Sequence, residues 1–108
     1  MRSVWRRAAL IVLAQALAVP APAGEVVQVK INDLAFVPAE ITVKVGDKIE
    51  WVNEDFIDHT ATAKSGEWDV MVPAGKSGQV PLDHAATITY FCRVHPGMTG
   101  TIQVSADR

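Results

Sequence analysis

The chain has 108 residues, with 12 acidic residues against 10 basic ones and a single cysteine. One cysteine excludes an internal disulfide, and an acidic balance without a basic cluster argues against a nucleic-acid partner. The length suits one domain close to the lower size limit for an independent hydrophobic core. A domain of this size without disulfides often relies on a bound metal ion.

The first residues have the layout of a secretory signal peptide. Three arginines precede the apolar run Ala8–Val19, and a small-x-small motif ends at Ala23. The alternative is an uncleaved anchor, but this uncharged run of twelve residues falls short of the roughly 20 that cross a membrane. We therefore predict a cleavable signal peptide at 1–23 and a periplasmic domain at 24–108, without stable membrane insertion. That domain would carry a net charge of −5, which favours a basic protein partner.

The mature chain consists of short segments in which apolar and polar residues alternate, separated by turn residues. Period-2 alternation with regular turn signals predicts an all-β sandwich or barrel. The predicted strands are Val27–Ile31, Ile41–Val45, Ile49–Asn53, Thr60–Lys64, Trp68–Val72, Gln79–Leu82, Thr87–Cys92 and Thr101–Ser105. We see no stretch with a helical apolar period, no internal repeat and no linker.

The strand Thr87–Cys92 places the single cysteine in the interior. Ile88, Tyr90 and Cys92 share one face, because alternate residues of a strand point the same way. The isoleucine and the tyrosine mark that face as the core side. A buried thiolate needs a compensating charge, which a metal ion would provide.

Four residues have the donor types and the spacing of a blue-copper site. Cys92, His95 and Met98 follow one another at three-residue intervals, and His59 lies upstream on a different predicted strand. Two imidazoles, one thiolate and a weak axial thioether are the ligands of a type 1 copper ion. Each residue alone has an ordinary interpretation as a core or surface side chain, but their combination indicates copper. The remaining histidine, His84, is too far along the strand from Cys92 to join them, and we interpret it as a solvated turn residue.

The segment before His59 carries an acidic cluster of Glu54, Asp55 and Asp58. It is either a docking surface for a basic redox partner or an ordinary solvated loop. An apolar patch around an exposed edge of His95 would suit a weak, fast-exchanging redox encounter. The candidates for that patch are Phe56, Ile57, Pro96 and Val72.

From Val26 to Ser105 the chain resembles the cupredoxins, and most closely the amicyanin and amicyanin-like group. The matching segments are 36–43, 45–53, His59-Thr60, 73–75 and the loop 90–98, whose short ligand spacing is the most specific part. The resemblance implies a Greek-key β-sandwich with one type 1 copper ion, and a periplasmic electron carrier with His95 as the electron port. Thr60 stands where many cupredoxins have asparagine.

The resemblance also bears on partners and on competing functions. It implies a monomer that exchanges electrons with a c-type cytochrome, an amine dehydrogenase or another periplasmic reductase or oxidase. The alternative is a periplasmic copper-binding protein for delivery, storage or detoxification. The mature chain has only Met71 and Met98 and no Met-rich or His-rich tract, which disfavours that alternative. Three histidines are also too few for the additional copper sites of a copper enzyme, so we do not expect an enzyme.

Overall fold

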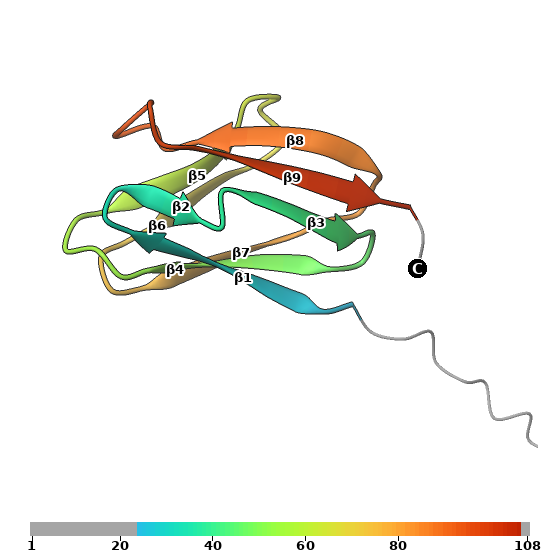
Figure 1. The fold of residues 1–108 in the computed structure, drawn as a ribbon, viewed down its shortest axis with the longest axis horizontal. Coiled ribbons are helices and arrows are strands. Elements are labelled where there is room, and N and C mark those ends of the chain that lie inside the picture. Colours follow the sequence, from blue (N-terminus) through green and yellow to red (C-terminus); the bar gives the residue numbers. More distant parts are fainter. Residues whose placement is uncertain (1–23, 107–108) are drawn as a thin grey trace, which may run out of the picture.

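The computed structural model describes residues 24–106, and strands are the regular elements of that range (Figure 1). The predicted signal peptide lies outside the described residues. The strands are β1 (Val26–Asn32), β2 (Ala35–Val37), β3 (Glu40–Lys44), β4 (Lys48–Asn53), β5 (His59–Ala63), β6 (Asp69–Val72), β7 (Ser77–Pro81), β8 (Ala86–Phe91) and β9 (Thr99–Ser105). Within this described range, no helix has the length and apolar character needed to cross a membrane.

The strands form two sheets that pack face to face. One sheet has the order β2-β1-β4-β7 and the other has the order β3-β9-β8-β5-β6. The pairs β1–β4 and β3–β9 are parallel, whereas the other pairs are antiparallel. The chain changes sheet repeatedly, for example from β3 to β4 and from β4 to β5 (Figure 1). The predicted Greek-key β-sandwich is confirmed.

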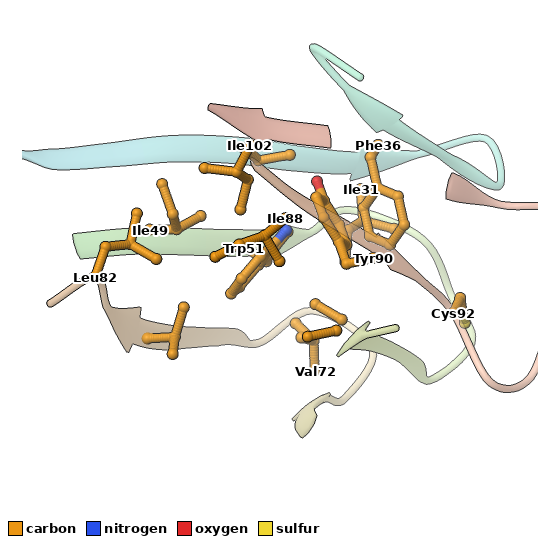
Figure 2. Close-up of a cluster of buried hydrophobic side chains, with 14 of the residues drawn as sticks. Ile31, Phe36, Ile49, Trp51, Val72, Leu82, Ile88, Tyr90, Cys92 and Ile102 are labelled. Atoms are coloured by element: carbon orange, nitrogen blue, oxygen red, sulfur yellow. The ribbon is translucent and has the colours of Figure 1, made fainter. Parts of the chain in front are cut away.

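The core lies between the two sheets and consists of the alternating apolar residues that the sequence placed there. Ile49 and Trp51 of β4 are wholly buried, as are Val29 and Ile31 of β1. Figure 2 shows this layer between the sheets, with Cys92 at one end of it and Leu82 at the other. The predicted inward phase of β8 is confirmed, since Ile88, Tyr90 and Cys92 are all buried.

An aromatic cluster fills the middle of this core. The ring centroid of Trp51 lies 5.3 Å from that of Trp68 and 5.4 Å from that of Tyr90. The ring centroid of Phe36 lies 4.6 Å from that of Tyr90. Tilted and edge-on pairs at these distances are favourable beyond the area that they bury. Gly100 lies under the Tyr90 ring, where a Cβ atom would come within 2.6 Å of three ring and hydroxyl atoms. Trp51 therefore belongs to the core, and Trp68 packs against it.

The sequence did not predict strand β2. It is a three-residue edge strand, and it pairs with β1 through a two-residue turn at Asp33 and Leu34. Both turn residues have positive φ, at 52° and 60°, which is the backbone of a type I′ hairpin. That turn normally favours Asn and Gly, so Asp-Leu gave no clear turn signal. Other strand ends differ by a residue or two; β8 ends at Phe91, one residue before the cysteine.

Candidate metal centre

The candidate site lies at one end of the sandwich, where β5 begins and β8 ends. His59 is the first residue of β5, and Cys92 directly follows β8. The loop after Cys92 folds back on itself, because the Cys92 amide donates to the Met98 carbonyl at 3.0 Å and the Met98 amide donates to the His95 carbonyl at 2.8 Å. This closed loop brings the three predicted loop residues together beside the start of β5.

Three donor atoms converge at this point. The ligand atoms of His59, Cys92 and His95 all lie within 4.8 Å of one another, and the His59 Nδ1 atom lies 3.6 Å from the Cys92 sulfur. The two imidazole rings have centroids 5.4 Å apart. His59 and Cys92 are wholly buried, whereas His95 is partly exposed. Within the part of the chain that the structure describes, no other three His, Cys, Asp or Glu residues converge in this way.

The nitrogen Nδ1 of His95 is buried and has no hydrogen-bond partner among the described residues. A buried polar atom without a partner costs about 1–3 kcal/mol and needs an explanation, such as a bound ion. His95 is one of the three residues whose ligand atoms converge. Met98, the fourth predicted residue, is buried in the core, and its backbone carbonyl accepts the hydrogen bond from the Cys92 amide.

Asp55 fixes the orientation of His59. Its Oδ2 atom accepts a hydrogen bond from His59 Nε2 at 2.8 Å, and a carboxylate can only accept. The proton of the neutral imidazole therefore resides on Nε2, and Nδ1 carries the lone pair that faces the cysteine. The same carboxylate accepts hydrogen bonds from the amides of Asp33 and Leu34, at 2.7 and 3.0 Å. Burial opposes ionisation, but these three donors together hold the pKa of Asp55 below its usual value.

Asn53 holds the loop that carries Asp55. Its side-chain carbonyl accepts a hydrogen bond from the Asp55 amide, and its side-chain amide donates to the carbonyls of Ile57 and Val72. Asn53 is only 1% exposed, so these bonds lie inside the protein. The β4–β5 loop is thus fixed from within, which places both Asp55 and His59.

The cysteine sulfur lies among hydrogen-bond donors. The Thr60 amide donates to it at 3.3 Å. Burial alone would raise the pKa of the Cys92 thiol, but the Thr60 amide, His59 and the amides of His95 and Val94 outweigh burial and lower the pKa to about 6. The site therefore favours a thiolate near neutral pH, and a thiolate is the form that binds a metal ion.

The Thr60 side chain ties the ligand loop to β5. Its hydroxyl accepts a hydrogen bond from the Arg93 amide at 2.9 Å and bonds the Thr62 hydroxyl at 2.9 Å. Thr62 donates to Asp69, which also accepts from the Arg93 guanidinium at 3.1 Å. These contacts form a closed ring. Thr60 is thus the residue that joins the two ligand-bearing segments.

Two other sequence predictions concern His84 and the acidic cluster. His84 lies outside the convergent group, as predicted. The acidic cluster has structural contacts: Asp55 binds His59, Asp58 accepts from the Ala74 amide at 2.9 Å, and Glu54 lies 3.7 Å from Lys30. Its role as a docking surface stays a prediction. Two of these three carboxylates have structural roles that the composition of the segment did not reveal.

Comparisons with known proteins identify the family. A family model described as copper binding proteins of the plastocyanin/azurin family matches residues 23–105. The chain belongs to this family. Amicyanin-alpha of Methylorubrum extorquens is 36% identical over 90 residues, which cover 78% of this chain and 75% of that protein. Plastocyanin of Scenedesmus fuscus is 34% identical over 85 residues, which cover 66% of this chain and 87% of that protein.

The solved structures agree with the sequences. A reduced amicyanin variant superposes with a TM-score of 0.66 at 27% identity, covering 74% of this chain and 82% of that one. The predicted resemblance to the cupredoxins and amicyanins is confirmed, and the chain is a member of a family of copper-binding electron carriers. Its cofactor is copper. The convergent nitrogen and sulfur donors suit this metal, since thiolates select Cu(I) and imidazoles also bind Cu(II).

Proposed function

We propose that this protein is a soluble periplasmic electron carrier that holds one copper ion at a type 1 site. His59, Cys92 and His95 would be its close ligands, and Met98 its weak axial ligand. The observation that carries the proposal is the convergence of one donor atom from each of His59, Cys92 and His95 within 4.8 Å. Bound copper would supply the redox step, accepting and releasing one electron as Cu(II) and Cu(I).

The protein holds its donors in place through groups other than the metal. Asp55 orients His59, and the Thr60 amide faces the Cys92 sulfur. Ligands that are fixed in this way change little between oxidation states, which favours rapid electron transfer. Hydrogen bonds to the sulfur also tune the reduction potential of such a centre.

His95 is the proposed electron port, because it is the partly exposed member of the three. Exposed apolar side chains lie on the two loops that meet at this end: Phe56 is fully exposed, Val94 is 55% exposed and Ile57 is 44% exposed. A small apolar surface suits a brief encounter with a redox partner. The partner would be a c-type cytochrome, an amine dehydrogenase or another periplasmic reductase or oxidase. The working form would be the monomeric domain 24–108, after removal of the signal peptide 1–23.

A copper-delivery role is the competing interpretation, and burial argues against it. Cys92 and His59 are both 0% exposed. A delivery protein must let the ligands of an acceptor reach the metal, whereas a carrier needs only one exposed edge. The arrangement therefore supports electron transfer over delivery.

Copper titration with visible absorption tests this proposal. One equivalent of Cu(II) should produce an intense blue thiolate-to-copper band, which Cys92→Ser should abolish. Met98→Leu should shift the band, while the matched control Met71→Leu, which changes a 52% exposed methionine of β6, should leave it unchanged. A pale spectrum in the unaltered protein would refute the assignment.

A further inference from the structure

A second cluster of metal-binding side chains lies away from the copper site. Glu67 lies in the connection between β5 and β6, and Asp83 and His84 lie in the connection between β7 and β8. Leu82, two residues before the histidine, occupies the end of the core opposite to Cys92 (Figure 2). The proposed electron-transfer role uses none of these three side chains.

The two ring nitrogens of His84 face different carboxylates. Nε2 lies 3.2 Å from Glu67 Oε2, and Nδ1 lies 2.7 Å from Asp83 Oδ1. Two ligands bonded to one metal ion at about 2.0–2.1 Å in tetrahedral geometry are separated by about 3.3 Å. The nitrogen and oxygen that face each other are therefore already at the spacing of two ligands of one ion. The Asp83 carboxylate faces the other ring nitrogen, Nδ1. In many metal sites a carboxylate at this nitrogen orients the histidine ligand.

The surroundings of His84 and Glu67 favour a positive charge and leave room for a bound cation. The hydrogen bond that the Asp83 carboxylate accepts from the ring and the charge of Glu67 raise the pKa of His84. The three residues border a surface cleft of about 430 Å³ that is also lined by Trp68. The side chain of Glu67 is 28% exposed and that of His84 is 55% exposed, so water can complete the coordination of a bound ion.

We propose that Glu67 and His84 form a second metal site for a divalent transition-metal ion, with Asp83 as the residue that orients the imidazole. An imidazole and a carboxylate, without sulfur, suit Zn²⁺ and Cu²⁺ and bind Cu²⁺ more tightly by the Irving–Williams order. The ion takes the place that a proton holds on Nε2 between the ring and Glu67. The two sites therefore differ in kind: one is buried and contains sulfur, whereas the other is open and contains only nitrogen and oxygen.

Zn²⁺ titration of the copper-loaded protein, reduced with ascorbate so that it is diamagnetic, tests the site. We expect one Zn²⁺ per chain with micromolar affinity by calorimetry and a shift of the His84 Nε2 resonance in ¹⁵N NMR. His84→Ala should abolish binding, and Glu67→Gln or Asp83→Asn should weaken it about tenfold or more. The matched control Glu50→Gln changes an exposed carboxylate that binds Gln28 and Gln79, and it should have no effect.

A second equivalent of Cu²⁺ gives an independent readout. It should add an ordinary Cu(II) EPR signal with wide hyperfine splitting, which His84→Ala removes. Zn²⁺ binding that survives His84→Ala, or a Kd above about 1 mM, would show an adventitious ion only and overturn the proposal. The same Zn²⁺ titration on Cys92→Ser protein separates this result from the proposed electron-carrier function, since the second site does not use the cysteine.

Discussion

Replacing Asp55 with leucine, which has a similar size but no hydrogen-bond acceptor, should destabilise the copper-free domain strongly. The change removes a charged acceptor that serves three donors: His59 Nε2 and the amides of Asp33 and Leu34. His59 is 0% exposed, so its N–H would lose its partner where water cannot replace it, at a cost of about 1–3 kcal/mol. The two turn amides are exposed, and each would lose about 0.5 kcal/mol of net stabilisation.

These contributions add to about 2–4 kcal/mol, which corresponds to a fall in Tm of roughly 10–25 °C for a domain of this size. Calorimetry of the copper-free domain at pH 7 measures the change. Asp58→Leu is the matched control, because Asp58 lies in the same loop and accepts a single bond, from the exposed Ala74 amide. It should lower stability by less than about 1 kcal/mol. Equal losses in the two variants would refute the argument that Asp55 holds His59.

Three further predictions concern Cys92, Thr60 and Gly100. In the copper-free protein, thiolate absorbance of Cys92 should appear with a midpoint near pH 6. Because the pKa of Cys92 is lower in the folded protein than in the unfolded chain, the thiolate contribution to stability should be complete above about pH 8.5 and lost as the pH falls through 6. A thiol that titrates near pH 9 would contradict this prediction. Thr60→Val should cost about 1–3 kcal/mol in urea unfolding, because it leaves the Arg93 amide unpaired, whereas Thr60→Ser should restore most of that loss. Gly100→Ala should destabilise the domain by about 1–3 kcal/mol because its Cβ atom meets the Tyr90 ring. The control Gly97→Ala should be neutral, because a Cβ atom there meets nothing within 4 Å. Similar melting temperatures for the two variants would contradict the packing around Gly100.

The sequence was sufficient to predict the sandwich and its core, because alternation along a strand is a local signal. Ile88, Tyr90 and Cys92 were assigned to the interior, and the structure buries all three. Pairing between strands depends on contacts that are distant in the sequence, so the parallel pairs β1–β4 and β3–β9 were not predicted. The short strand β2 was not predicted because the turn that precedes it lacks the usual Asn-Gly signal.

The candidate site shows the same division between local and non-local information. The spacing of the loop residues identified Cys92 and His95, and the structure brings both together with His59. The role of Asp55 was missed because the segment appeared only as a cluster of charges. Asp55 contacts His59 because the β4–β5 loop and the β1–β2 turn fold against each other. A carboxylate four residues before a candidate ligand histidine, ahead of a strand, is the signal that could have indicated it.

The EPR spectrum of the domain loaded with one equivalent of Cu(II) tests the central claim most directly. A type 1 site should give a narrow hyperfine splitting from a copper ion bound to the Cys92 sulfur, and this signal should disappear on reduction and return on reoxidation over repeated cycles. A wide splitting that persists in Cys92→Ser protein would place copper on nitrogen and oxygen ligands alone and would contradict a type 1 electron-transfer site.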